Sequence, residues 1–329
     1  MSKKNKLIRA KLIANPGAGN VLEAATRLAQ VTSYLSDYGL KVDVALAHPK
    51  KEAIPIARKA VKDGYDVVIA MGGDGTLGAV ISGIAGSEVR LGIIATGTEN
   101  DIAASLGIPE DLQEACALIA SGHIRKLDLG QISTSKTKKF YFLMMAAVGL
   151  TATIFPMIKE IPEGNYSGIK DAITTFLKFN SKPTVYLTLD DESKIEVETM
   201  LVTIANTPLT GMKNLVAPDA SMEDGLLDIA VYPDFSKAEV LGYFAQTANK
   251  GAIGDGSIQR YQARKIKVKT SPKLDIAAEG TLVGKGTAWI RLLPGALRVI
   301  APEPGAGTER HKEKAAKRMP ESAFAVAGQ

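Results

Sequence analysis

The sequence contains few of the residues on which several common chemistries depend. Cys116 is the one cysteine, and it lies in an apolar pattern typical of a buried helix face. A single cysteine excludes a disulfide framework and a multi-cysteine metal site. The three histidines, His48, His123 and His311, stand in no motif of a Ser-His-Asp triad or a zinc centre. The chemistry must therefore depend on other side chains.

Long hydrophobic runs and targeting signals are also scarce. The basic start, residues 1–12, lacks the apolar segment of a secretory signal. Residues 140–158 carry no charge over 19 residues, near the length needed to span a bilayer, but Gly149 and Pro156 interrupt them. We expect a buried strand there that runs into a turn and a short helix. The protein is expected to be cytoplasmic, and any membrane contact is then peripheral, at the inner membrane face.

The overall composition is that of an ordinary globular protein, with 46% hydrophobic and 23% charged residues. The net charge of +5 suits anionic partners such as nucleotides or lipid headgroups without identifying one. Aromatic residues make up 5% of the chain and are scattered, so they form no stacking platform and we expect no nucleic-acid partner. The sequence leaves the oligomeric state open, a homodimer included.

The first 130 residues alternate short β-rich runs with helical patterns. Strands alternating with helices indicate βαβ crossovers and a doubly wound parallel sheet. The expected strands cover residues 10–15, 40–46, 66–71, 90–95 and 124–130, and the expected helices cover 21–38, 52–62, 76–84, 100–106 and 112–120.

After residue 130 the pattern becomes β-rich. Residues 184–206 predict two strands around a polar turn, and only residues 236–250 read clearly as a helix. The predicted fold class is therefore α/β, a doubly wound N-terminal domain (1–130) followed by a β-sandwich domain (131–295). Residues 305–329 lose periodicity and are expected to form a flexible tail. Further short strands are expected at 226–232, 265–270, 273–278, 287–293 and 296–301.

Three strands of the first domain end in glycine-bearing loops, each followed by a helix: NPGAGN (15–20), GGDGT (72–76) and TGTEND (96–101). The carboxyl ends of parallel strands share one edge, where ligands bind. Glycines admit a ligand to the backbone N–H groups, and helix N-termini favour anions. The loops predict a polyphosphate site that is neither a Walker A motif nor a dinucleotide fingerprint. The residues expected to hold the nucleotide are Asn15, Pro16, Gly17, Gly19, Gly72, Gly73, Gly75, Thr76, Gly97, Thr98, Asn100 and Asp101.

Three aspartates, Asp74, Asp101 and Asp128, fall at or near the carboxyl ends of predicted strands. A carboxylate beside polyphosphate is repulsive unless a divalent cation intervenes, and Mg²⁺ typically takes one or two carboxylates plus phosphate oxygens. The set predicts Mg–nucleotide binding and phosphoryl transfer, with Asp74 also in the catalytic machinery. For each aspartate taken singly, an N-cap or a surface turn remains the alternative.

At these motifs the chain resembles the diacylglycerol kinase catalytic family, which includes bacterial lipid kinases and sphingosine kinases. The marks, in the family's order over residues 7–302, are NPGAG, GGDGT, GTEND, LDLG, VAPDASMEDGLLDIAVY and LLPGALRVI. GGDGT alone is shared with NAD kinases and phosphofructokinases, whereas GTEND and APDASMEDGLLD discriminate lipid kinases far better. The resemblance implies ATP and Mg²⁺ between the two domains and a last segment, about 296–304, that returns to the first domain. It also implies that Asp224 binds a structural Mg²⁺.

The chain departs from the family at the loop that carries Asp-Gly-Glu, whose Asp is the proposed base. Here Glu279, Gly280 and Thr281 take those places, and Met144 stands where an asparagine is usual. The resemblance implies Glu279 as the base, although its extra methylene moves the carboxylate by about one C–C bond, and an ångström of misplacement can cost roughly a hundredfold in rate.

These observations favour an ATP- and Mg-dependent lipid kinase that transfers the γ-phosphoryl group to a lipid hydroxyl such as that of diacylglycerol. The alternative is a nucleotide- or lipid-binding family member with lost or altered kinase activity. A soluble-substrate kinase such as an NAD kinase is disfavoured, because GTEND and the second-domain signature are absent from that group. No short motif encodes the choice of lipid.

Overall fold

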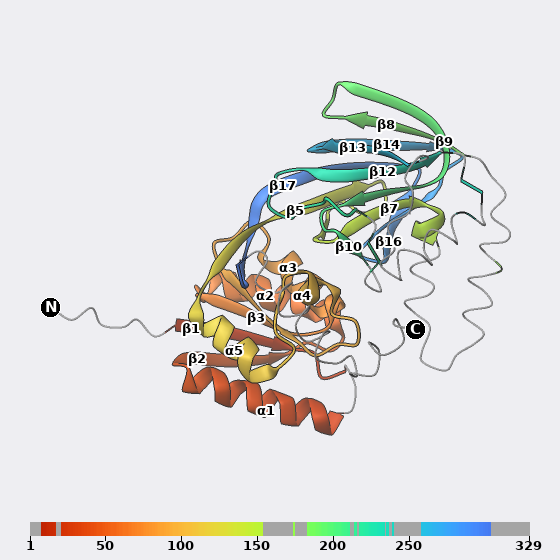
Figure 1. Ribbon diagram of the computed structural model, residues 1–329. Coiled ribbons are helices and arrows are strands. Elements are labelled where there is room, and N and C mark those ends of the chain that lie inside the picture. Colours follow the sequence, from red (N-terminus) through yellow and green to blue (C-terminus); the bar gives the residue numbers. More distant parts are fainter. Residues whose placement is uncertain are drawn as a thin grey trace, which may run out of the picture.

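The computed structural model describes residues 8–17, 21–153, 174, 183–210, 214–215, 217–233, 235–236, 239 and 258–303 (Figure 1). Gly19, most of the helix expected at 236–250 and the tail expected at 305–329 lie outside these residues.

The N-terminal part is a parallel sheet in the order β4-β3-β1-β2. Its central strand, β3, is buried over its whole length, because helices cover both faces of the sheet. This confirms the predicted doubly wound arrangement for four of the five expected strands. The fifth, expected at 124–130, is not part of the parallel sheet: it begins β5 (Ile124–Thr134), which pairs antiparallel with β17 (Thr287–Ile300). The strands are β1 (Ile8–Ala14), β2 (Leu40–Leu46), β3 (Val67–Gly72) and β4 (Arg90–Ala95).

The helices divide between the two faces of this sheet. One face packs against α1 (Val21–Asp37) and α5 (Leu112–Ser121), and the other packs against α2 (Ala53–Lys62) and α3 (Asp74–Ile84) (Figure 1). Cys116 is fully buried in the first layer, as its apolar pattern predicts, and burial raises the pKa of its thiol to about 12. A one-turn 3-10 helix, η1 (Lys50–Glu52), and the short α4 (Asp101–Ser105) complete the helices of this part.

The second part is a β-sandwich, as expected. One layer contains β7, β9, β12, β13, β15 and β16, and the other contains β5, β6, β8, β14 and β17. The long β9 pairs with β8 in its first half and with β7 and β12 in its second, so it joins the layers. Apolar side chains from both layers fill one core. The bounds are β5 (Ile124–Thr134), β6 (Phe140–Phe142), β7 (Met145–Gly149), β8 (Thr184–Leu189), β9 (Ser193–Ala205), β10 (Leu209–Thr210), β11 (Asn214–Leu215), β12 (Leu227–Pro233), β13 (Gln259–Ala263), β14 (Lys265–Ser271), β15 (Asp275–Ala278), β16 (Thr281–Lys285) and β17 (Thr287–Ile300).

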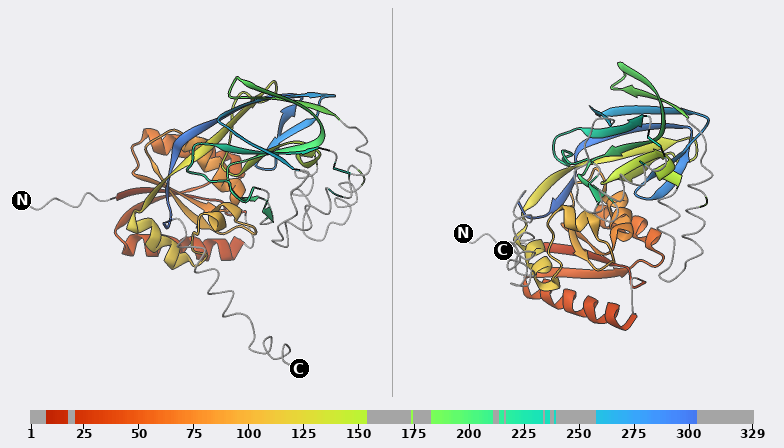
Figure 2. Two further views of the ribbon diagram at one scale, coloured as in Figure 1. Left: turned by 45° about the horizontal axis from the view of Figure 1, so that its top comes forward. Right: turned by 45° about the vertical axis from the view of Figure 1, so that its right-hand side comes forward.

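Two strands, β5 and β17, run from the sandwich into the α/β part (Figure 1, Figure 2). The segments predicted as separate strands at 287–293 and 296–301 are one strand, β17, bent by a register shift between Leu293 and Leu297. The Pro294–Gly295 pair suggests a break, but a bulge absorbs it and the strand continues. Its end pairs in parallel with β4, Arg298 opposite Arg90.

The uncharged stretch beginning at residue 140 forms two short strands, β6 and β7, with mostly buried side chains. Of the helices that the described residues form, none combines the length and the apolar character needed to cross a bilayer.

Candidate active site

The first two glycine loops are held together by one amide side chain. Asn15 follows β1, and its Nδ2 donates to the hydroxyl of Thr76 on α3 at 3.2 Å, while its Oδ1 accepts from the Gly17 N–H at 3.0 Å. Thr76 is only 2% exposed. Two residues predicted to face the nucleotide therefore also fix the relative position of their loops.

The second and third loops touch each other through their glycines. A Cβ at Gly97 would lie 2.4 Å from the Cα of Gly73, so no larger residue fits without separating the loops. Asn100, at the left-handed φ of +54°, accepts from the Gly97 N–H and donates to the Gly97 carbonyl. The glycines predicted to admit a ligand thus also allow two loops to approach closely.

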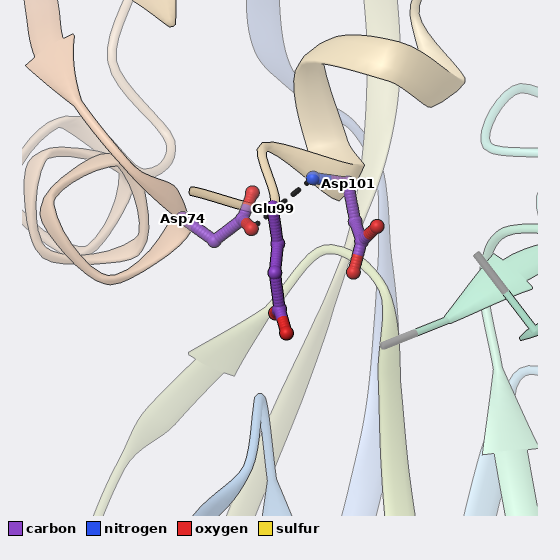
Figure 3. Close-up of side chains that lie close together, drawn as sticks. All are labelled: Asp74, Glu99 and Asp101. Atoms are coloured by element: carbon purple, nitrogen blue, oxygen red, sulfur yellow. Dashed lines mark hydrogen bonds between the residues drawn. The ribbon is translucent and has the colours of Figure 1, made fainter. Parts of the chain in front are cut away.

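Asp74 links the GGDGT loop to the helix of the next loop. It begins α3, and its carboxylate accepts from the backbone N–H of Asp101 at 3.1 Å (Figure 3) and from that of Ile102, also at 3.1 Å. These N–H groups belong to the first turn of α4, where no carbonyl within the helix can accept them. Asp74 therefore caps α4 from a different loop, and a negative charge there is favourable.

Three carboxylates gather at this point. Ligand oxygens of Asp74, Glu99 and Asp101 all lie within 4.8 Å of one another (Figure 3). Asp101 is 2% exposed, Asp74 is partly buried, and Glu99 is exposed. Close carboxylates repel each other unless a cation lies between them, and oxygen ligands of this kind suit Mg²⁺. The acidic group therefore fits a Mg²⁺ ion by its chemistry.

Glu99 is a member of this group that the sequence reasoning missed. It stands in TGTEND between Thr98 and Asn100, both of which were expected at the site. Thr98 is exposed like its neighbour. The signal for Glu99 was its place in a loop that already carried Asp101.

Asp128 and Asp224 lie outside the acidic group formed by the described residues. Asp128 is buried, and its two oxygens accept from the N–H groups of Gly225 and Gly295, each at 2.7 Å. It joins β5 to the turn before β12 and to the bend of β17. The structure thus uses both of its oxygens in hydrogen bonds.

Asp224 is an exposed turn residue whose Oδ1 accepts from the Leu226 N–H at 3.0 Å. It lies near Asp228 and not in the group around Asp74. Burial, with the charges of Asp224 and Asp219, raises the pKa of Asp228, while a hydrogen bond from Gln262 lowers it.

Glu279 occupies the turn between β15 and β16, with a left-handed φ of +49°. Its Oε1 accepts from the N–H groups of Leu143 and Met144, both at 2.7 Å, and its own N–H donates to the Met145 carbonyl. The candidate base is therefore oriented by the link between β6 and β7.

The link between β6 and β7 lies in the same buried core as α3 and α4, the helices that follow the second and third glycine loops. Leu143 and Met144 belong to the same buried cluster as Leu77 of α3 and Ile102 of α4. Ile102 is one of the two residues whose N–H groups bind Asp74. The acidic group and Glu279 are thus each hydrogen-bonded to a residue of this one cluster, Ile102 and Met144 respectively.

A cavity lies beside the first loop, between β1 and α1. It has a volume of about 220 Å³ and is mainly apolar, with Ala14, Asn15, Leu28, Met71 and Thr96 among its lining residues. A flat heterocycle fits such a cavity better than a phosphate does.

A doubly wound domain with glycine loops and an acidic group on one edge, continuous with a β-sandwich, defines a two-part protein in which an α/β domain is joined to a β-sandwich. The profile of the diacylglycerol kinase catalytic domain matches residues 9–132, and that of the YegS C-terminal NAD kinase beta sandwich-like domain matches residues 160–301.

The chain is 31% identical to a diacylglycerol kinase of Staphylococcus saprophyticus and 28% identical to one of Bacillus subtilis; each alignment covers 84% of this chain and 90% of the relative. A crystal structure of a diacylglycerol kinase from Bacillus anthracis has the same fold, with a TM-score of 0.70 and 22% identity over 91% of this chain and 98% of that one. The chain belongs to the diacylglycerol kinase family, which confirms the resemblance seen in its motifs.

Proposed function

We propose that the protein is an ATP- and Mg²⁺-dependent lipid kinase that phosphorylates the hydroxyl of a lipid such as diacylglycerol. The observation that carries the proposal is that one buried cluster supports both Asp74 and Glu279. Ile102, whose N–H binds Asp74, and Met144, whose N–H binds Glu279, both belong to that cluster. The cluster thereby connects the acidic group, whose chemistry suits Mg²⁺, with Glu279, the carboxylate that takes the place of the family's base. The matched relatives named diacylglycerol kinase support the class of reaction.

In this proposal the phosphates of ATP lie along the glycine loops, where the N-terminus of α3 favours negative charge. Asp74, Glu99 and Asp101 would hold the Mg²⁺ ion, which would neutralise phosphate charge when bound. The adenine occupies the apolar cavity beside Asn15. The phosphates and the adenine of ATP would then both lie along the carboxyl edge of the sheet.

Glu279 accepts the proton of the lipid hydroxyl. The hydroxyl oxygen forms a bond to the γ-phosphorus, the bond from that phosphorus to the β–γ bridging oxygen breaks, and ADP leaves. The two N–H groups on Oε1 keep the carboxylate oriented during this step.

Transfer of labelled γ-phosphate from Mg–ATP to mixed micelles tests the proposal, with diacylglycerol, a sphingoid base, ceramide and phosphatidylglycerol as acceptors. The matched variant is Glu279→Gln, because its amide oxygen can still accept from Leu143 and Met144 while the basic group is lost. We expect a labelled lipid from the wild type and a loss of about a hundredfold or more in the variant. Equal turnover by the variant would show that Glu279 is not the base.

One observation favours the second candidate, a nucleotide-binding family member without transfer. Glu279 Oε1 is already bound by two N–H groups, and Thr281 replaces the second carboxylate of the family's motif. This candidate predicts that Mg–ATP binds, as measured by calorimetry, while no acceptor in the panel is labelled. A labelled lipid product from the wild type excludes it.

A further inference from the structure

An open groove lies on the outer face of the sandwich layer that contains β5, β8, β14 and β17. Along β14, exposed Lys265, Lys267 and Lys269 alternate with core residues, so the lysines point away from the sandwich core. The groove has a volume of about 310 Å³. None of its lining residues belongs to the glycine loops or to the turn of Glu279.

A buried amide on this groove lacks an acceptor. Gln131 lines the groove and is 9% exposed. Its Oε1 accepts from Nε of Arg291 at 2.7 Å, which fixes the orientation of the amide, but its buried Nε2 has no hydrogen-bond partner in the structure. A buried N–H donor without an acceptor is unfavourable, so a ligand oxygen at this point would be stabilised.

The charged groups around the amide are mainly cationic. Lys265, Lys267 and Arg291 line the groove with one carboxylate, Asp191, which lies 3.0 Å from Lys265. Among the ion pairs of the described residues, none involves Lys267 or Arg291. The hydroxyls of Ser133 and Thr188 add further possible donors. A guanidinium beside an amide N–H suits a planar or tetrahedral oxyanion.

An aromatic ring stands beside these donors. Trp289 is 51% exposed, lines the groove, and lies directly opposite Lys267 and Ser133 in the strand register. An indole ring at the surface offers a flat apolar area next to a polar one. The ligand it fits has carbon atoms next to its anionic group.

We propose that this groove binds a phosphate ester, with the phosphate oxygens on Gln131 and Arg291 and the adjoining carbon atoms on Trp289. The phosphate can belong to the headgroup of an anionic phospholipid or to a soluble phosphate ester. The site does not depend on the proposed kinase activity, since it shares no residue with that site.

Trp289 is the one tryptophan in the chain, so the tryptophan fluorescence of the full protein reports on this groove. The protein is titrated with phosphatidylglycerol vesicles, with phosphatidylcholine vesicles and with glycerol 3-phosphate, and calorimetry follows the same titrations. We expect a saturable change with phosphatidylglycerol or with glycerol 3-phosphate. A response to phosphatidylglycerol alone identifies a lipid headgroup as the ligand, and a response to glycerol 3-phosphate identifies a soluble ester.

No binding of either phosphate by both methods would overturn the proposal, and so would an equal response to phosphatidylcholine. ATP is absent throughout, so the result does not depend on turnover. A kinase without groove binding would refute only this inference, and binding without turnover would refute only the proposed function.

Three variants separate a built site from a basic surface. Arg291→Gln removes the charge next to the amide and is expected to weaken binding about tenfold or more, the loss of one charged hydrogen bond. Gln131→Leu removes the buried donor and is expected to weaken binding several-fold. Lys269→Gln is the matched control. It removes one positive charge, as Arg291→Gln does, from the same face of the layer, but Lys269 does not line the groove.

We expect the control to bind within about twofold of the wild type. Equal losses in Arg291→Gln and Lys269→Gln would show diffuse charge attraction and overturn the proposal. Circular dichroism of each variant checks that the sandwich is folded.

Discussion

Removing the carboxylate of Asp74 should destabilise the protein and abolish its response to magnesium, through two different roles. In Asp74→Ala, α4 loses both acceptors for its first N–H groups. Loss of a helix cap costs roughly 0.5–2 kcal/mol. Because the cap also joins two loops, we expect the upper part of that range, about 1–2 kcal/mol, and a decrease in Tm of roughly 3–6 °C.

Asp74→Asn separates the two roles. Its amide keeps one acceptor for α4 but lacks the negative charge, so about half of the stability loss is expected. If Asp74 holds Mg²⁺ as proposed, both variants should lose turnover by about a hundredfold or more, since the negative charge available to the ion is gone. Thermal unfolding with and without MgCl₂ and ATP measures stability and ligand response together.

Glu99→Gln is the control for the charge alone. Glu99 is exposed, and the α4 cap is formed by Asp74, so the variant should retain its stability without metal to within about 0.5 kcal/mol. It should show a smaller Tm increase with Mg–ATP than the wild type. The reasoning is refuted if Asp74→Ala is as stable as the wild type, or if Asp74→Ala responds to Mg–ATP like the wild type.

The remaining predictions concern a contact between two loops, a buried carboxylate and a buried thiol. Gly97→Ala should weaken ATP binding by tenfold or more in calorimetry, because its Cβ would meet the backbone of Gly73, whereas Gly78→Ala, with open space around it on α3, should bind ATP normally. Asp128→Ala should lower the free energy of unfolding by about 2–3 kcal/mol in urea titrations, since two partly buried N–H groups lose a buried, charged acceptor. Cys116 should react with a thiol reagent at pH 8 only after unfolding, because a pKa of about 12 keeps the buried thiol protonated in the folded protein.

The gathering of the three glycine loops on one edge could be predicted from the sequence, because the carboxyl ends of parallel strands share one edge. The roles of individual side chains could not. Asp74 was expected to serve a metal, yet it also caps α4, which requires knowing how two loops meet. Gly97 was expected to admit a ligand, yet its nearest neighbour is Gly73. Both contacts are between loops that are distant along the chain, and no local pattern records them.

The same reason explains the error at β17. Pro294 and Gly295 are local signals for a break, and the sequence predicted two strands. The N–H of Gly295 donates instead to Asp128, 167 residues away along the chain, and the strand continues through a bulge. Long-range hydrogen bonds decide whether such a pair ends a strand or bends it.

Two departures from the family pattern meet in the structure. Glu279 replaces an aspartate and Met144 replaces an asparagine. The backbone N–H of Met144, which any residue but proline supplies, donates to the carboxylate of Glu279, while the Met144 side chain is buried in the apolar cluster. Glu279→Asp shortens the side chain by one methylene and withdraws the carboxylate from the β6–β7 link, so by itself it should lower turnover. If the two positions are coupled, Glu279→Asp with Met144→Asn should be more active than the two single changes predict.

A double-mutant cycle on lipid phosphorylation measures this coupling, and contacting residues typically give 0.5–3 kcal/mol. We expect about 1 kcal/mol, or roughly fivefold in kcat/KM. Thr281→Glu with Glu279→Asp is the comparison, because Thr281 begins the exposed end of β16 and makes no hydrogen bond to the β6–β7 link. Strict additivity of the Met144 pair would mean that the two departures arose independently and that the link only holds Glu279 in place.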